Sequence, residues 1–266
     1  DVRSVGSSVL EETYNETSNF TGNGTGSGTR TTRQASGNEL EKTSFSNTTA
    51  VPRQIYLLKS DDGIHWSDVP VRITPQVTVD YSHPWLIYAM DKYYLVWDAG
   101  GSGGGRDIEL TFSEDGINWS DPIDVSGIDD YFDTDPALLY SQNQFVLVWV
   151  SNRFDNFTYI GSGVETLLTY STSVDGMNWS NASAIHPRYC DDTSPYLSVD
   201  DVGRILLTWS SDRKEFDAPP DARDSNTNIW YSVFAGGRWD SPSPLTSVSE
   251  SDVVPAMFQD ASGRYW

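Results

Sequence analysis

The sequence has little cysteine, histidine, lysine or methionine: one Cys, three His, four Lys and three Met among 266 residues. A single thiol, Cys190, excludes an internal disulfide, and the scattered histidines give no zinc or haem signature. No apolar run approaches the roughly 18 residues that span a bilayer, and no basic segment followed by an apolar one marks a signal peptide. Helical periodicity is also missing. These absences exclude direct membrane insertion and favour an all-β chain.

Positive charge is scarce as well. The chain has 38 acidic and 17 basic residues and a net charge of −21. A surface this negative repels phosphate backbones and anionic lipids, so nucleic acid is excluded as a partner. Cations are the natural counterparts, which makes calcium the one cofactor worth considering.

Eight N-x-Ser/Thr sequons occur, and two of them, at Asn118 and Asn178, fall inside a repeated turn motif. The other six are glycosylation candidates: Asn15, Asn19, Asn23, Asn47, Asn156 and Asn181. Three of them lie within nine residues, a density that favours an extracellular or cell-surface protein. Residues 1–50 are rich in Ser, Thr, Gly and Asn and have no apolar period, which indicates a flexible linker or stalk.

From residue 51 onward the sequence repeats. The first repeated element is a turn with the pattern Ser-x-Asp-Gly-x-x-Trp, in which Gly accepts the positive φ that a tight turn needs. Its three copies are Ser60, Asp62, Gly63 and Trp66; Ser113, Asp115, Gly116 and Trp119; and Ser173, Asp175, Gly176 and Trp179. A degenerate fourth copy ends at Trp239, so the Trp spacings are 53, 60 and 60 residues.

The second repeated element is a residue followed by proline at the start of an apolar run. It occurs at His83-Pro84, Asp135-Pro136, Ser194-Pro195 and Val254-Pro255. Between the two elements lie runs rich in β-branched and aromatic residues, giving four short strands per repeat. The repeat units are 51–74 plus 250–266, 80–126, 132–186 and 191–247. Four strands per unit predict a β-propeller of four-stranded antiparallel blades.

The turns resemble the Asp-box, or bacterial neuraminidase repeat, of sialidase-like propellers, with one residue fewer between Asp and Gly. The Ser-x-Asp-Gly-x-x-Trp pattern and the Asp135-Pro136 strand are also similar to five-bladed glycosidase propellers, the furanosidase and arabinanase group. The resemblance covers residues 54–266 and implies the fold more strongly than the function. Four blade units are visible, one of them split between the two ends, and we expect the chain to be a fragment of a larger propeller.

Carboxylates gather before the inner strands, where propellers bind ligands. A ring of carboxylates suits a glycosidase, which needs one protonated acid and one ionised base or nucleophile. It also suits calcium, for which Asp129, Asp130, Asp133, Asp191 and Asp192 are candidate ligands. The bland alternative is that these acids are only turn formers. The full set of ligand-binding candidates is His83, Asp133, Asp135, Arg153, Asp191, Asp192, Arg213 and Asp252.

The resemblance to furanosidase propellers implies a base Asp, a pKa-tuning Asp and an acid Glu on three successive inner strands. Asp135 matches the tuning Asp, whereas His83 and Ser194 stand where the base and the acid are expected. Sialidases use three arginines, and only Arg153 and Arg213 occupy equivalent positions here; a structural ion pair is the alternative role for both.

These incomplete catalytic sets favour a non-catalytic propeller that serves adhesion, surface assembly or glycan binding, with glycans or other surface proteins as partners. The alternative is a glycoside hydrolase, sialidase-like or furanosidase-like, in which Asp135, Asp133 and Asp192 are the catalytic candidates.

Overall fold

The computed structural model describes residues 9–12, 27–31, 42–46, 51–76, 78–100, 105–153, 166–187, 190–213, 223–247 and 250–266. These residues form strands and turns, and no helix occurs among them. Five of the predicted sequons lie outside the described residues, at Asn15, Asn19, Asn23, Asn47 and Asn156.

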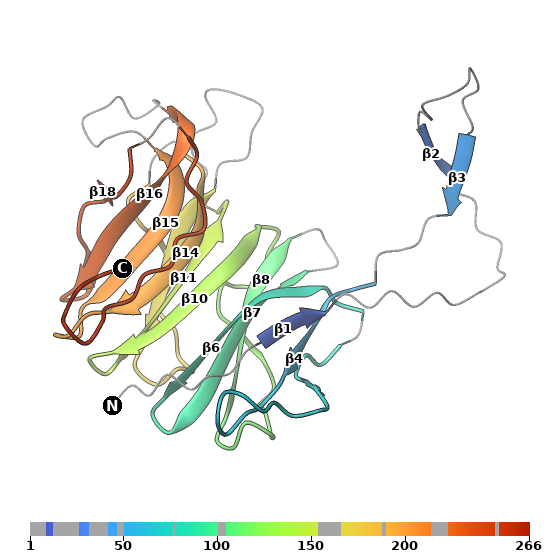
Figure 1. The fold of residues 1–266 in the computed structure, drawn as a ribbon, viewed down its shortest axis with the longest axis horizontal. Coiled ribbons are helices and arrows are strands. Elements are labelled where there is room, and N and C mark those ends of the chain that lie inside the picture. Colours follow the sequence, from blue (N-terminus) through green and yellow to red (C-terminus); the bar gives the residue numbers. More distant parts are fainter. Residues whose placement is uncertain are drawn as a thin grey trace.

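Three antiparallel sheets of four or five strands make up most of the fold, and Figure 1 shows them side by side in an arc. The first blade contains β6 (Tyr81–Ala89), β7 (Lys92–Gly100), β8 (Arg106–Ser113) and β9 (Ile123–Asp124). The second contains β10 (Asp133–Ser141), β11 (Gln144–Ser151), β12 (Leu167–Ser173) and β13 (Ser183–Ala184). The third contains β14 (Asp192–Val199), β15 (Ile205–Arg213), β16 (Arg223–Ala235), β17 (Arg238–Trp239) and β18 (Ser243–Pro244). The inner strands β6, β10 and β14 are neighbours, as the predicted β-propeller requires.

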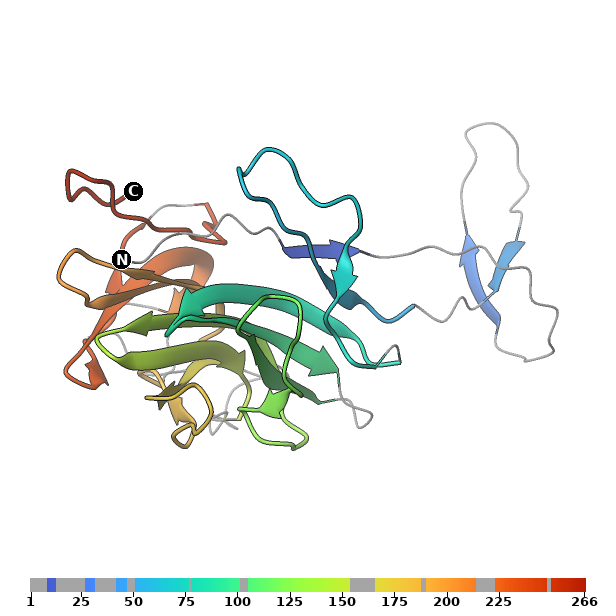
Figure 2. The same cartoon turned by 90° about the horizontal axis from the view of Figure 1, so that it is seen from below.

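The N-terminal sheet differs from the expected split blade. Strand β4 (Gln54–Leu57) lies between β5 (Val71–Arg72) and β1 (Val9–Glu12), so β1 takes the place predicted for residues 250–266. Residues 258–266 instead form a small hairpin of their own, joined by the bridge between Gln259 and Tyr265. Figure 2 shows β1 beside β4, and a further hairpin of β2 (Ser27–Thr31) and β3 (Lys42–Ser46) apart from the blades.

The three repeated turns have one hydrogen-bond pattern. In the second copy, the amides of Ile117 and Asn118 donate to Asp115 Oδ1 at 2.7 and 2.8 Å, and the amide of Gly116 donates to Ser113 Oγ at 2.8 Å. Two backbone amides on one carboxylate hold the pKa of Asp115 well below its usual range. The Ser and Asp of the motif thus satisfy amides that a tight turn would otherwise leave unpaired.

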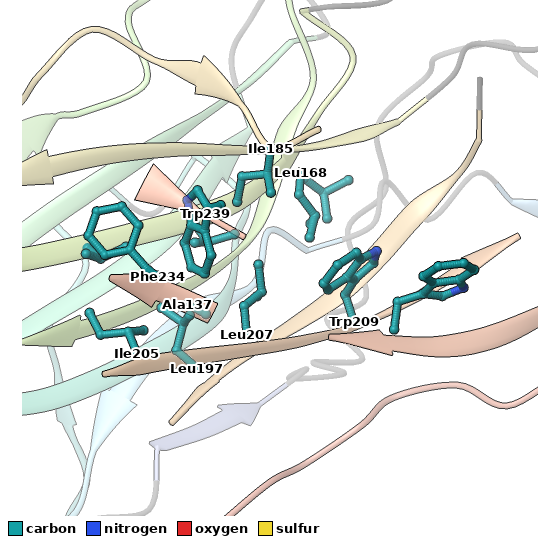
Figure 3. Packing of buried hydrophobic residues seen from close by; sticks show 13 residues of the cluster. Ala137, Leu168, Ile185, Leu197, Ile205, Leu207, Trp209, Phe234 and Trp239 are labelled. Carbon is teal, nitrogen blue, oxygen red and sulfur yellow. The ribbon is translucent and has the colours of Figure 1, made fainter. Parts of the chain in front are cut away.

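The core consists of apolar layers between neighbouring sheets. Trp97, Trp149 and Trp209 occupy the same position on β7, β11 and β15 and are completely buried. Figure 3 shows side chains such as Ala137, Leu207 and Trp239 packed together, in the layer that joins the second and third blades. Burying one large apolar side chain contributes about 1.5–3 kcal/mol, so the repeated Trp fixes each sheet against the next.

The turn glycines provide a matched test of this packing. Gly63 and Gly176 occupy the same turn position with φ of 75° and 74°, but a Cβ on Gly63 would meet nothing within 4 Å, whereas one on Gly176 would lie 2.6 Å from the Tyr94 ring. Gly63→Ala therefore adds only left-handed strain, about 1–2 kcal/mol, and Gly176→Ala adds a further overpacking cost of about 1–3 kcal/mol. Urea denaturation of both variants measures the difference; equal losses would contradict this account of the turn.

Candidate functional site

The residue before each repeated proline has an unusual backbone. A residue that precedes proline normally adopts an extended conformation, yet His83, Asp135 and Ser194 have φ of 50°, 55° and 53°. Each lies at a register shift where the inner strand bulges away from its partner. Left-handed backbone at a non-glycine residue costs on the order of 1–3 kcal/mol and concentrates at functional sites. The repeated strain therefore marks the inner strand starts as the candidate site.

A buried carboxylate, Asp98 on β7, holds the first two of these strand starts together. His83 Nδ1 lies 2.6 Å from Asp98 Oδ2, and Ser82 Oγ donates to Asp98 Oδ1 at 2.6 Å. From the next blade, Thr134 Oγ1 and the amide of Asp135 donate to Oδ2 at 2.6 and 3.1 Å. A carboxylate only accepts hydrogen bonds, so His83 carries a proton on Nδ1. Nε2 is then the nitrogen that exchanges protons.

Asp98 is ionised despite its burial. Burial alone would raise its pKa, but the hydrogen bonds from His83, Ser82 and Thr134 and the charge of Arg106 lower the pKa of Asp98 to about 2. Arg106 Nε donates to Asp98 Oδ1 at 2.8 Å, and its NH1 nitrogen lies 3.1 Å from Asp80 Oδ2. The carboxylate is thus anionic throughout the neutral pH range.

Asp80 joins this network to the N-terminal sheet. Arg53 contacts both of its oxygens, with Nε 3.0 Å from Oδ1 and NH2 2.7 Å from Oδ2. The hydrogen bonds and charge of Arg53 and Arg106 hold the pKa of Asp80 well below its usual range. Two arginines and two aspartates therefore form one charge-balanced chain, from Arg53 just before β4 to Asp98 on β7.

Asp135 has the opposite electrostatic character. Burial raises its pKa, a protonated and therefore cationic His83 lowers it, and the negative charge of Asp98 adds to the rise. The backbone amide of Ser194 on the third blade donates a hydrogen bond to the Asp135 carboxyl group. The Asp98 carboxyl group is thus kept ionised, whereas that of Asp135 is pushed toward the protonated form. This arrangement separates acid from base roles.

The repeat explains why the backbone amide of Ser194 binds the Asp135 side chain. Asp98, Val150 and Ser210 each follow the buried Trp on the second strand of a blade. Asp98 accepts the amide of Asp135, and Ser210 Oγ accepts the amide of Val254 at 3.0 Å. Val150 has no acceptor, and the equivalent amide, from Ser194, is bound by the Asp135 side chain instead.

The two candidate arginines form ion pairs at equivalent positions. Arg153 NH2 lies 3.0 Å from Asp133 and 2.8 Å from Asp129. Arg213 NH2 lies 2.6 Å from Asp192, and its guanidinium group stacks over Trp209 and Trp230. Asp133, Asp192 and Arg213 are almost fully buried, and their ion pairs link strands within their blades.

The remaining candidates are less connected to the site. Asp191 accepts from the amide of Thr166 at 3.2 Å, and the amide of Asp252 donates to Thr227 at 2.8 Å. Asp130 is exposed. Among the described residues, no group of three or more His, Cys, Asp or Glu side chains is arranged to hold a metal ion. Calcium therefore stays a prediction, and Asp129 and Asp133 bind Arg153 here.

Sequence reasoning missed Asp98, Arg106 and Asp107. For Asp98 a signal was present: the other blades have Val or Ser after the buried Trp, and only the first has a charged residue. Arg106 follows a Gly-rich loop outside the repeat pattern, and no sequence feature connects it to Asp98.

Comparison with known proteins supports the fold. No family model matches the chain, and no curated protein matches its sequence. Solved structures that match include an α-L-arabinofuranosidase of Fusarium graminearum in complex with arabinobiose (16% identity, TM-score 0.54, covering 76% of this chain and 60% of that one). An α-L-arabinanase of Penicillium chrysogenum complexed with arabinobiose matches at 15% identity and TM-score 0.55, covering 80% of this chain and 64% of that one.

An endo-arabinase of Bacteroides thetaiotaomicron matches at 16% identity and TM-score 0.54, covering 80% of this chain and 79% of that one. The chain spans 60% and 64% of the length of the first two structures. At these identities the likeness establishes the β-propeller fold alone. Separately, the described residues include no helix that is long and apolar enough to cross a membrane.

A stability measurement tests the electrostatic environment of Asp107. Burial, with repulsion from Asp124, raises the pKa of Asp107 to about 6. Because the folded-state pKa lies above the unfolded value, this group favours the folded state at low pH, and that stability is lost as pH rises from about 4 to 6. We expect Asp107→Asn to match the parent chain near pH 4 and to be more stable at pH 7.

Asp200→Asn is the control of opposite sign. Burial acts to raise the pKa of Asp200, but hydrogen bonds from Arg204 outweigh it and lower that pKa. Asp200 therefore stabilises the folded state above its ordinary pKa and loses that effect in acid, so Asp200→Asn destabilises most at neutral pH. Denaturant titrations from pH 4 to 7 measure both variants; a gain from Asp107→Asn that is independent of pH would contradict the raised pKa.

Proposed function

We propose that this propeller is a glycoside hydrolase whose site is built from Asp135 and the His83–Asp98 pair. The observation that carries the proposal is the separation of two neighbouring carboxyl groups: Asp98 has a pKa of about 2, whereas the pKa of Asp135 is raised. Glycosidic bond cleavage needs a protonated acid beside a base, and this pair of environments supplies both.

Asp135 acts as the general acid. Its raised pKa keeps it protonated at a higher pH than an ordinary aspartate, and it donates that proton to the oxygen of the departing sugar. The hydrogen bond from the amide of Ser194 fixes the carboxyl group on the strained strand start.

His83 acts as the base. Asp98 holds the proton on Nδ1, so Nε2 takes a proton from the attacking water molecule while the bond to the leaving oxygen breaks. Asp98 touches no substrate in this scheme and is a positioning residue. Because no covalent intermediate forms on a histidine base, the product sugar has inverted anomeric configuration.

The substrate class comes from the structural neighbours. Several are arabinanases or arabinofuranosidases, and two were solved with arabinobiose. L-Arabinose-containing oligosaccharides and polysaccharides are therefore the first substrates to test.

Carbohydrate binding without hydrolysis is the second candidate function, and Ser194 favours it. Of the three equivalent strand starts, one has a carboxyl group, at Asp135, whereas His83 has an imidazole and Ser194 a hydroxyl group. A lectin-like propeller of this kind would bind arabinan and release no sugar.

The test is sugar release from arabinan, arabino-oligosaccharides and aryl α-L-arabinofuranosides, together with binding to each. We expect Asp135→Asn and His83→Gln each to lower kcat by at least about 100-fold, because general acid–base catalysis contributes about 10²–10⁴-fold. Asp115→Asn, which alters a turn far from the site, is the control and should leave kcat unchanged.

Activity that survives Asp135→Asn would contradict the proposed acid. Binding by the parent chain, with no release from any substrate, would establish the second candidate instead.

A further inference from the structure

We infer that Asn181 is an N-glycosylation site, and that its first sugar lies in a pocket against Trp179 between the first and second blades. Three sequons fall within the described blades, at Asn118, Asn178 and Asn181. They share the N-x-Ser pattern but differ in what their side chains do. This inference concerns the outer edge of the blades and is independent of the proposed catalysis.

The amide nitrogens of Asn118 and Asn178 are already used by the fold. Asn118 Nδ2 donates to Asp115 Oδ2 at 2.8 Å, and Asn178 Nδ2 donates to Asp175 Oδ2 at 2.8 Å. A glycan is attached to this same nitrogen, so modification would leave it one hydrogen and place a sugar directly against the turn.

The hydroxyl groups of these two sequons are engaged as well. Ser120 Oγ accepts from the amide of Phe112 at 3.1 Å, and Ser180 Oγ accepts from the amide of Thr172 at 3.0 Å. Both sequons are thus structural parts of the turn.

Asn181 has neither constraint. Its side chain and that of Ser183 are exposed, and no hydrogen bond joins the amide nitrogen of Asn181 to another described residue. The segment is a short connection that leads into β13 at the surface, the kind of location where N-linked glycans occur.

The sequon at Asn181 departs from the sequence that the first and third blades have at the same position of the repeat. The residues that follow the turn Trp by two and three positions are Asp121-Pro122 in the first blade and Ser241-Pro242 in the third. In the second blade they are Asn181-Ala182. Proline in the middle position would abolish a sequon, so both the Asn and the Ala are needed to create it.

A pocket beside Asn181 has room for the sugar. Its volume is about 500 Å³, within the range of roughly 300–1,000 Å³ that small-molecule sites have. Trp179, Asp124 and Arg153 line it together with Asn181. An indole face stacks on the apolar face of a sugar ring, and the charged groups can pair with its hydroxyl and acetamido groups.

The test is to produce the full chain in a glycosylating secretory host, beside a reporter glycoprotein that verifies the host. Enzymatic release of N-glycans converts each modified asparagine to aspartate, and fragment masses then distinguish Asn181 from Asn178. We expect conversion at Asn181 and none at Asn118 or Asn178. An unmodified Asn181 beside a modified reporter, or conversion at Asn118 or Asn178, would overturn the inference.

Ala182→Pro is the matched control. It keeps Asn181, restores the residue found at this position in the first and third blades, and should remove the glycan without loss of thermal stability. The pocket is tested by trimming the glycan to one N-acetylglucosamine and recording the indole N–H resonance of Trp179, assigned with Trp179→Phe. A shift relative to Ala182→Pro is expected, and an unchanged resonance would overturn the placement of the sugar.

Discussion

The hydrogen bonds around the Asp98 carboxylate are the constraint on which the site depends. This side chain is completely buried, and an ionised carboxylate in such a place is stable only when its oxygens are paired. Its partners come from two blades: His83, Ser82 and Arg106 from the first, and Thr134 and Asp135 from the second. Removing the charge of Asp98 would therefore disturb both the contact between the two blades and the orientation of His83. The same carboxylate serves the packing of the blades and the placement of the candidate base.

The repeat made the fold predictable. Each local signal, the Asp-Gly turn, the buried Trp and the residue–proline step, is short-range in sequence and recurs in register, so blade boundaries could be placed without long-range information. Strands β6, β10 and β14 begin where the prolines predicted them. The same logic did not place β1, because it comes from a Ser/Thr-rich segment with no apolar period and pairs with β4 in an antiparallel register.

The site was predicted only where it coincides with the repeat. His83, Asp135 and Ser194 follow from the proline step, and the pairing of Arg153 and Arg213 with nearby acids follows from their equivalent positions. The contact between Asp98 and Arg106 could not be predicted from the sequence, since it depends on the register of β7 and β8. The network around Asp98 depends further on the close approach of β10. The raised pKa of Asp107 depends likewise on its burial and on the charge of Asp124 on β9. Electrostatic environment is a property of three-dimensional neighbours, which residue order does not encode directly.

The strained strand starts connect the fold to the chemistry. A left-handed residue before proline is unfavourable in two ways, yet three inner strands retain it, at His83, Asp135 and Ser194, and Val254 repeats it outside any strand. At Asp135 and Val254 the amide of that residue is bound by an acceptor on the preceding blade, so the contact between blades holds the strained backbone in place. The scaffold thus fixes four equivalent positions whatever side chains they have. Their chemistry then depends on the side chain at each position and its surroundings. An ionised partner makes His83 a candidate base, a desolvated setting makes Asp135 a candidate acid, and Val254 has no proton to exchange.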